Sequence, residues 1–492
     1  MSEPLIYDLS APGRCGVVLP ESDVPQADLP PQALLRDDLP LPEVSEIDIV
    51  RHYLRLSQMN HGVDKGFYPL GSCTMKYNPK VNEQVARLPG LTGLHPYQDL
   101  DTVQGAMFLI YTLQEWLKEI GGFAGVSLQP SAGAHGEMTG VLMMRRYLHD
   151  RGETGRNKVL IPDSAHGTNP ATTSMSGLKV VQIPSDEDGN VDLAALEVAC
   201  DETVVGLMLT NPNTLGLFEA HVEKVADLIH GCGGLLYGDG ANLNAILGVA
   251  KPGDLGIDVL HFNLHKTFST PHGGGGPGSG PVGCVEALEP YLPGPIAAIE
   301  PGSDEDDLPP FYVWHTPEKS IGRVKAFYGN FGVLVRAYTY IRMLGAQGLQ
   351  RVAEHAVLNA NYLRALLKEV YPVSHERTCM HEFVLAGPPQ DVQEAGVHTM
   401  DVAKRLMDFG FHPPTVYFPL IVPEALMIEP TETESKETLD AFAQAMLKIV
   451  EEAREDPETL HAAPHSAPVR RLDEVGAARR PVLCCEWPVV EE

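Results

Sequence analysis

A lysine that follows a short apolar segment is the residue whose position most clearly suggests chemistry. Lys266 lies in His265-Lys266-Thr267, directly after residues 258–264, which predict a buried strand, and before the glycine-rich residues 273–280. An amine partly removed from water loses its proton more readily and can attack a carbonyl group. A lysine on a surface loop is the usual alternative, but dense glycines let the backbone approach a ligand or a neighbouring subunit closely. In a P-loop the glycines precede the lysine, so this is a different kind of site.

A carboxylate lies at the end of another predicted strand. Asp239 is in the sequence Tyr-Gly-Asp-Gly-Ala that ends at Ala241. A carboxylate there can keep the nitrogen of a heterocycle protonated, and the small Ala241 leaves room for a flat ring. An ordinary Asp-Gly turn is the alternative.

Three further loops place small and polar residues next to predicted helices or strand ends. Residues 129–137 open a helix, whose free N–H groups and dipole suit a phosphate. His135 could stack on a ring there, although a capping or core histidine is the alternative. The loops over 163–170 and 209–216 add two hydroxyl groups. The candidates from these loops are Ser131, Ala132, Gly133, Ala134, His135, Thr168 and Thr210.

Together these groups point to one cofactor. A carboxylate for a ring nitrogen, a stacking ring, a phosphate-binding helix start and a Schiff-base lysine fit pyridoxal 5′-phosphate (PLP). Its protonated pyridine ring accepts electrons from a carbanion, and the protein decides which bond breaks.

The elements that must position these residues alternate regularly from about residue 100. Short apolar segments that alternate with helices predict a parallel sheet wrapped by helices, and ligands bind such sheets at the carboxyl ends of the strands. The strands are expected at 158–161, 178–183, 203–209, 235–237 and 259–264. The helices are expected at 136–148, 169–176, 191–200 and 221–230.

The C-terminal part has a different order of expected helices and strands, which predicts a small α+β domain. Helices are expected at 329–345, 351–370, 399–409 and 436–452, and strands at 382–385 and 425–428. The expected organisation is an N-terminal extended and helical arm (1–95), a large PLP-binding domain (96–340), the small domain (341–455) and an extended tail (456–492).

Composition excludes several classes of protein. The 492 residues include 36 Lys and Arg against 65 Asp and Glu, a net charge of −29, which argues against a nucleic acid or an anionic membrane as the main partner. The longest uncharged run, 267–285, is rich in Gly and Pro and cannot be a membrane helix. No secretory signal is visible. The eight cysteines are scattered without a C-x-x-C pair, so we expect a reducing, cytoplasmic location.

Several segments resemble the glycine dehydrogenase (decarboxylating) family, the P-protein of the glycine cleavage system. The similarity extends from about residue 45 to about 455. It is carried by PLGSCTMKYNP (69–79), PSAGAHGE (130–137), DSAHGTNPA (163–171), NPNTLG (211–216), YGDGANLNA (237–245) and HFNLHKTFSTPHGGGGPGSGPVG (261–283).

The resemblance implies a fold and an assembly. The fold is PLP-dependent transferase fold type I, that of aspartate aminotransferase, an α/β architecture with a large, mostly parallel mixed sheet and a small C-terminal α+β domain. The family exists as one long chain of two homologous halves or as two separate subunits. This chain has the length and the lysine of subunit 2, which implies a subunit 1 partner in an α2β2 heterotetramer.

The resemblance also implies a reaction. Lys266 would hold PLP as a Schiff base until glycine displaces it, and the glycine carboxylate would leave as CO2. The carbanion would attack the disulfide of the lipoyl arm on H-protein, which makes the enzyme an aminomethyl-transferring oxidoreductase. The expected catalytic residues are Lys266 and His135. The expected PLP contacts are Ser131, Ala132, Gly133, Ala134, His135, Thr168, Thr210, Asp239, Ala241, His265 and Lys266, and the expected substrate contacts are Ser72 and Cys73.

Three alternatives remain at this point. Another reaction of the same fold is one, but an aminotransferase needs a carboxylate-binding arginine, for which Arg377 is the only obvious candidate, and a desulfurase needs a mobile cysteine. A non-catalytic scaffold is the second. A metal site on His261, His265 and His272 is the third; no carboxylate joins them, so no metal is expected.

Overall fold

Seven strands form the main sheet of the computed structural model, which describes residues 3–25, 27–36, 39, 41–273, 278–301 and 310–483. Their order is β1-β7-β6-β5-β4-β2-β3, and β7 alone runs antiparallel to its neighbours. The strands are β1 (Gly125–Ser127), β2 (Lys158–Pro162), β3 (Lys179–Ile183), β4 (Val204–Thr210), β5 (Leu235–Gly240), β6 (Val259–Phe262) and β7 (Val282–Cys284). The mostly parallel mixed sheet that we expected is confirmed. β1 and β7, with three residues each, were not predicted.

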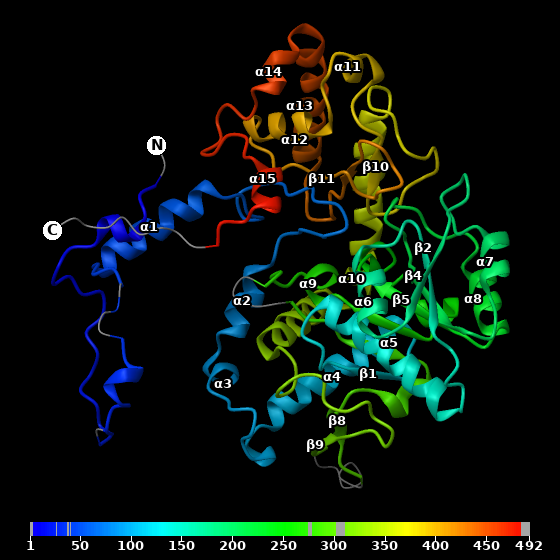
Figure 1. The fold of residues 1–492 in the computed structure, drawn as a ribbon. Coiled ribbons are helices and arrows are strands. Elements are labelled where there is room, and N and C mark those ends of the chain that lie inside the picture. Colours follow the sequence, from blue (N-terminus) through cyan, green and yellow to red (C-terminus); the bar gives the residue numbers. More distant parts are fainter. Residues whose placement is uncertain are drawn as a thin grey trace. The chain divides into compact units, whose positions relative to one another are not determined.

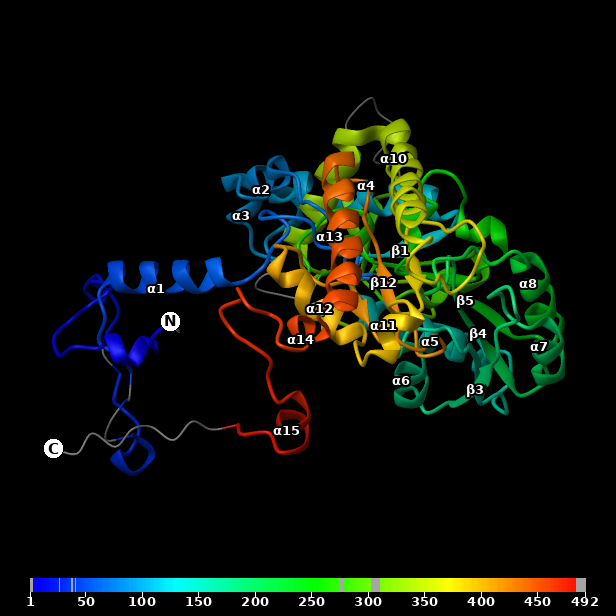
Figure 2. The ribbon, with the colours of Figure 1, turned by 90° about the horizontal axis from the view of Figure 1, so that it is seen from above.

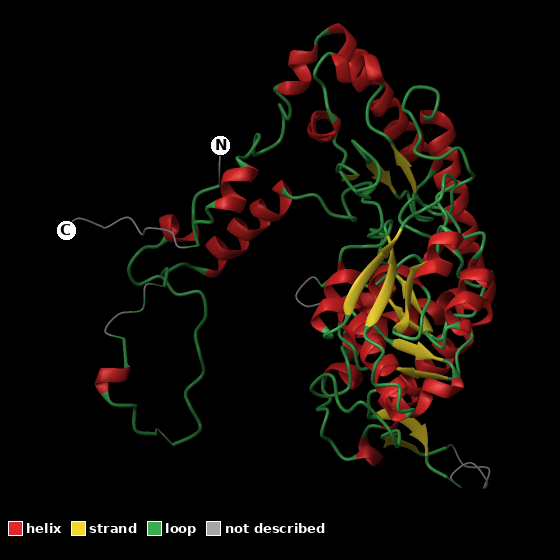
Figure 3. Cartoon of the chain, turned by 45° about the vertical axis from the view of Figure 1, so that its right-hand side comes forward, coloured by secondary structure: helices red, strands yellow, loops and turns green. Residues whose placement is uncertain are grey.

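Helices cover both faces of this sheet (Figures 1 and 3). The central strands β4 and β5 are buried along their whole length, as continuous apolar strands between two helical layers must be. The covering helices include α4 (Gln104–Gly121), α5 (Gly133–Asp150), α6 (Thr168–Met175), α7 (Leu193–Ala199) and α8 (Val222–Gly231), and the short α9 (Leu264–Thr267) follows β6. The first of them ends where Gly122 takes a left-handed conformation (φ 72°), which glycine adopts without strain.

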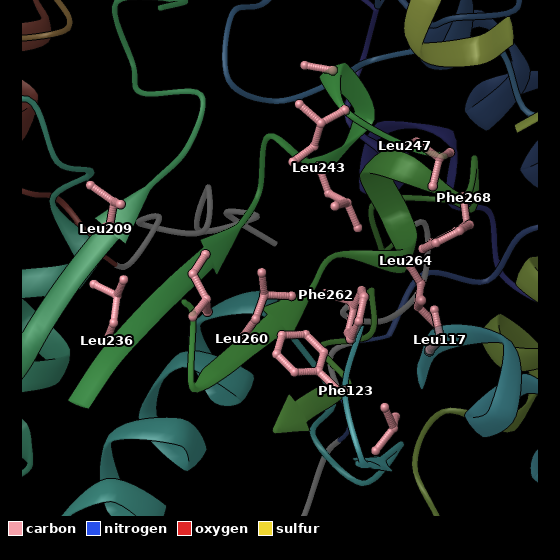
Figure 4. Packing of buried hydrophobic residues seen from close by; sticks show 14 of the residues in the cluster. Leu117, Phe123, Leu209, Leu236, Leu243, Leu247, Leu260, Phe262, Leu264 and Phe268 are labelled. Carbon is pink, nitrogen blue, oxygen red and sulfur yellow. The ribbon is translucent and has the colours of Figure 1, made fainter. Parts of the chain in front are cut away.

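The core between sheet and helices is close-packed around β4, β5 and β6. Figure 4 shows Leu209, Leu236 and Leu260 on these three neighbouring strands. Phe123 and Phe262 meet edge to face, with ring centroids 6.3 Å apart. This packing fixes the strand ends that carry the candidate site.

A smaller antiparallel sheet has the order β10-β12-β11. It comprises β10 (Phe383–Leu385), β11 (Thr415–Val416) and β12 (Leu426–Ile428), with α11 (Gln390–Glu394), α12 (Thr399–Asp408), α13 (Lys436–Glu455) and α14 (Pro457–His461) nearby. α13 packs alongside α10 (Phe331–Leu367) (Figure 2). α10 was expected as two helices. Two helices are present in this span, and they meet at a kink at Gly345, whose φ of 64° is not helical.

The described chain divides into two compact units, one of residues 67–462 and one of residues 3–66 with 463–483. The larger also contains α2 (Lys80–Ala86), α3 (Pro89–Thr92) and the pair β8 (Ile296–Ile299) and β9 (Tyr312–His315). The smaller contains α1 (Glu46–Met59) and α15 (Glu474–Arg479). The domain boundaries expected at residues 95, 340 and 455 remain predictions. Residues 274–277 of the glycine-rich stretch, and Cys484 and Cys485, lie outside the described residues. Among the helices that the structure describes, none has the length and apolarity needed to cross a membrane.

Candidate active site

A cavity of about 200 Å³ lies at the carboxyl ends of β4, β5 and β6. All of its walls belong to the larger unit. The structure brings together many of the residues that the sequence singled out, although their loops are far apart in the chain. Those that line the cavity are Ser72, Gly133, Ala134, Thr168, Thr210, Asp239, Ala241, His265 and Lys266.

Lys266 enters the cavity from α9, the turn of helix that follows β6. Leu264 and Phe268 are fully buried at the two ends of this turn and anchor it to the core (Figure 4). The Lys266 amine donates a hydrogen bond to the backbone oxygen of Ser72, at 2.8 Å. The amine is therefore held at the mouth of the site by one neutral acceptor.

Asp239 ends β5 and is 5 % exposed. Its carboxylate accepts from the backbone N–H of Ala241 (2.9 Å) and from the Asn169 amide (3.2 Å), and lies 3.5 Å from His261 Nε2. Burial alone would raise the pKa of Asp239, but the His261 ring, the Ala241 N–H and the Lys266 amine hold that pKa below its usual value. Asp239 is thus an ionised carboxylate in a dry wall, suited to pair with a protonated ring nitrogen.

The three histidines near Lys266 do not converge on a common point. His261 Nδ1 hydrogen-bonds the Tyr237 hydroxyl (2.6 Å), and its Nε2 lies 2.8 Å from the amide nitrogen of Asn263. His265 Nδ1 accepts from the Ser279 N–H (3.2 Å). His272 Nε2 donates to the Cys73 carbonyl (2.7 Å). The burial of His265 lowers its pKa to about 3, so this ring is neutral in the cavity wall.

The start of α5 forms one end of the cavity. Gly133 and Ala134 line it, and no side chain among the described residues caps the helix at Ala132. A Cβ on Gly133 would overlap Asn263 Oδ1, so a larger residue there would displace the Asn263 amide. An uncapped N-terminus of an 18-residue helix is a site for an anion such as a phosphate.

His135 does not lie where we expected it. Its Nδ1 accepts from the Ser131 N–H (3.2 Å) and faces the Ser131 hydroxyl (3.2 Å), and neither residue lines the cavity. His166 lines the cavity instead. It lies in the loop between β2 and α6, whereas His135 is the third residue of α5, whose first two residues line the cavity. The sequence places both histidines next to small residues and does not show which of them lines the cavity.

Two polar groups in the cavity wall have unusual environments. The Thr210 hydroxyl is buried and has no hydrogen-bond partner among the described residues, which marks a place for a polar ligand atom. Glu137 accepts from the Thr168 hydroxyl (2.9 Å). Burial and the neighbouring Asp239 raise the pKa of Glu137 to about 7. Glu137 and His166 lie within the sequence motifs, but no role was predicted for either.

Arg377, the candidate carboxylate-binding arginine of an aminotransferase, and Cys73, an expected substrate contact, both lie outside the cavity lining. Arg377 donates to the backbone oxygens of Asp188 (2.7 Å) and Phe218 (3.0 Å) and to the Asn190 side chain (2.9 Å), so its guanidinium is engaged within the fold. Burial raises the pKa of the Cys73 thiol to about 11, which keeps it protonated and a weak nucleophile. Cys73 does not line the cavity, whereas Ser72 does.

A second lysine, Lys76, is buried beside the site and supports it. Its amine contacts Glu432 (2.7 Å), Asn244 (2.8 Å) and the backbone oxygen of Thr267, next to Lys266 (2.9 Å). The sequence analysis missed it because its partners lie far along the chain.

We expect Lys76→Met to destabilise the protein by about 3–5 kcal/mol, because it leaves the Glu432 carboxylate without its cation in a dry site. Urea unfolding of the full chain measures this free energy. Lys436→Met is the matched control: its ion pair with Asp440 (2.7 Å) is exposed, so its loss should cost less than about 1 kcal/mol. Equal effects of the two substitutions would contradict the proposal that the buried Lys76 supports the site.

The donor set of the cavity fits PLP. A lysine amine, an ionised buried carboxylate, an uncapped helix start and an orphaned threonine hydroxyl face one space. The fold and this site define a PLP-dependent protein with the aminotransferase-like fold. A family model for class-V aminotransferases matches residues 142–275, and one described as "Glycine dehydrogenase, C-terminal domain" matches residues 352–468.

Comparison with known proteins makes the assignment narrower. A probable glycine dehydrogenase (decarboxylating) subunit 2 of Desulforamulus reducens is 59 % identical over 489 residues, 98 % of this chain and 99 % of the relative. One from Pyrococcus abyssi is 56 % identical over 494 residues, 100 % of this chain and 97 % of the relative. The chain therefore belongs to the glycine dehydrogenase (decarboxylating) subunit 2 family.

Solved structures agree on the fold. The crystal structure of a glycine decarboxylase (P-protein) of the glycine cleavage system, in inhibitor-bound form, superimposes with a TM-score of 0.72 at 24 % identity, covering 86 % of this chain and 93 % of that one. A glutamate decarboxylase of Lactobacillus brevis gives 0.63 at 11 % identity, covering 89 % and 96 %.

Proposed function

We propose that this chain is the PLP-bearing subunit of a glycine decarboxylase of the glycine cleavage system. The observation that carries the proposal is the meeting of Lys266, Asp239 and the start of α5 on one cavity, in a chain of this family. When bound, PLP withdraws electrons from the α-carbon of the substrate and so weakens its bond to the carboxylate.

The cavity residues have separable tasks. Lys266 would hold the cofactor covalently and take it back after each turnover. Asp239 would keep a proton on the ring nitrogen, because its own carboxylate stays ionised. Gly133 and Ala134 would bind the phosphate through backbone N–H groups, while Ser131 and Ala132 shape that turn.

Other residues would hold the ring and its substituents. His166 is proposed to stack on one ring face, in place of His135, and Ala241 to contact the other. The orphaned hydroxyl of Thr210 is available to a polar atom of the cofactor. Thr168 and His265 are weaker candidates for such contacts, since both already have partners within the protein. Ser72, whose backbone oxygen accepts from the Lys266 amine, would contact the substrate.

The proposed substrate is glycine, which loses CO2 and passes its aminomethyl group to the lipoyl arm of H-protein. The proposed partner is a subunit 1, in an α2β2 assembly in the cytoplasm. The numbering of the relatives as subunit 2 supports a separate subunit 1. The engaged Arg377 and the protonated Cys73 thiol disfavour an aminotransferase or a desulfurase.

Exchange of labelled bicarbonate into the carboxyl group of glycine tests this function. We expect exchange when the chain is co-expressed with subunit 1 and supplied with PLP and lipoylated H-protein, and almost none from the chain alone. PLP binding without exchange in the complete mixture would refute the proposed reaction. Exchange by the isolated chain at the rate of the complex would refute the need for the partner.

A further inference from the structure

The segment around Ser72 has a backbone conformation that its residues do not favour. Ser72 and Thr74 have positive φ angles of 58° and 49°, although neither is a glycine. Such residues persist only where their surroundings determine the conformation. Because Ser72 supplies the acceptor for the Lys266 amine, whatever fixes this segment also fixes the lysine.

Two buried glutamates hold this segment from the small sheet. Glu382, just before β10, accepts from both the N–H (2.5 Å) and the hydroxyl (2.9 Å) of Ser72. Glu429, just after β12, accepts from both the N–H (2.9 Å) and the hydroxyl (2.6 Å) of Thr74. Each carboxylate thus clamps one of the two residues with positive φ.

The strand edge brings the segment into register with these glutamates. Leu70 forms an antiparallel bridge to Ile428, and the Glu429 N–H donates to the backbone oxygen of Pro69 (3.2 Å). A Cβ on Gly71 would overlap Met427, so the close approach needs a glycine.

Among the described residues, no lysine or arginine forms an ion pair with this cluster. Glu382, Glu429 and His381 are all fully buried, and His381 Nε2 lies 3.9 Å from an oxygen of each glutamate. Neither ring nitrogen of His381 has a hydrogen-bond partner among the described residues. The other charged or titratable groups that face the cluster are the amines of Lys266 and Lys76 and the Cys73 thiol. One carboxylate oxygen of Glu382 lies within 4.8 Å of one of Glu429. Two carboxylates this close in a dry site disfavour double ionisation.

We propose that His381, Glu382 and Glu429 form a buried cluster that retains one proton at neutral pH and positions Ser72 against Lys266. These are positioning residues, and their effect on the cofactor rests on the proposed attachment of PLP to Lys266. The proton is on a carboxyl group, because burial lowers the pKa of His381 to about 3. Burial raises the pKa of Glu429 to about 7. Burial and the neighbouring Glu429 raise the pKa of Glu382.

The retained proton has a definite effect on stability. An acid whose folded pKa lies above its unfolded value stabilises the fold most below the unfolded pKa of about 4.3. That contribution disappears as the pH rises through the folded pKa, here about 7 for Glu429. The free energy of unfolding should therefore contain a component that falls between about pH 5 and pH 8.

The first test follows the unfolding of the cofactor-free full chain between pH 5 and pH 8.5 for Glu382→Gln, Glu429→Gln and the double variant. Glu429→Gln should remove this component, because the fall is assigned to Glu429, and the double variant should remove no more. If the two single substitutions removed independent, additive parts of the fall in stability, the claim that the cluster retains a single proton would be wrong. Glu434→Gln is the matched control, because burial also raises the pKa of Glu434 to about 7 but its carboxyl group does not contact Ser72 or Thr74. This substitution should remove a separate fall of its own, and its effect should add to that of Glu429→Gln.

If the glutamine variants do not fold, a milder variant still tests the proposal. Thr74→Val removes one hydroxyl donor to Glu429 and should move the fall in stability to higher pH. An unchanged midpoint would overturn the proposal. So would a rise in wild-type stability on adding Zn²⁺ or Mg²⁺ that the variants lack, because a cation would then occupy the cluster.

The second test uses the visible absorption band of the PLP-loaded chain, titrated with pH. Removing the negative charge of the cluster should make a positive charge at Lys266 less favourable. The midpoint of the double variant should shift downward, and that of Glu434→Gln should not. An unshifted double variant would overturn the positioning role. A wild type without any visible band would instead refute the proposed cofactor. The stability test would still show whether the cluster retains one proton.

Discussion

Lys266→Ala is expected to lower bicarbonate exchange by at least about 10⁴-fold, the size of loss seen when a covalent nucleophile is removed. The substitution leaves β6, α9 and the remaining cavity residues in place, because the lysine side chain is outside the core and makes one hydrogen bond. The exchange assay on the complex with subunit 1 and lipoylated H-protein measures the effect.

The matched control is Lys251→Ala. Lys251 pairs with Glu119 on the surface (2.7 Å), away from the cavity, and its loss should leave exchange unchanged. Exchange that survives in Lys266→Ala would show that the reacting lysine lies elsewhere.

Asp239→Asn is expected to lower the exchange rate by about 10²–10³-fold, as when one electrostatic group is removed from a preorganised site. Asparagine has nearly the same shape and can still accept from the Ala241 N–H. It cannot supply the charge that keeps a ring nitrogen protonated, so the ring should withdraw electrons less strongly. The rate at saturating glycine and PLP is the measurement.

Asp201→Asn is the control for this second prediction. Asp201 pairs with Lys158 (2.6 Å) and is 44 % exposed, so its loss removes an acid of equal size far from the cavity. A similar rate for Asp239→Asn and this control would contradict the role assigned to Asp239.

The parts of the site that depend on local pattern could be predicted from the sequence. Lys266, Asp239 and Thr210 follow apolar strands, and parallel strands bring their carboxyl ends to one edge. The short edge strand β1 and the antiparallel β7 leave little periodicity in three residues each. The order of strands was therefore not available. The choice between His135 and His166 was not available either, because it depends on which side chain faces the cavity at the start of α5 and in the loop after β2.

The parts that depend on long-range contacts could not be predicted. Lys76 is buried against Glu432, and Ser72 against Glu382, through contacts that join opposite ends of the chain. No spacing in the sequence marks such pairs. The positive φ angles of Ser72 and Thr74 also have no local cause, because they are imposed by the glutamates and by the close approach at Gly71.

Reductive trapping of the cofactor tests the central claim most directly. The wild-type chain, purified with PLP, would be treated with borohydride, digested and mapped by mass spectrometry. We expect one modified peptide, which carries the cofactor on Lys266. A cofactor found on another lysine, including the buried neighbour Lys76, or no trapped cofactor in a folded chain, would contradict it.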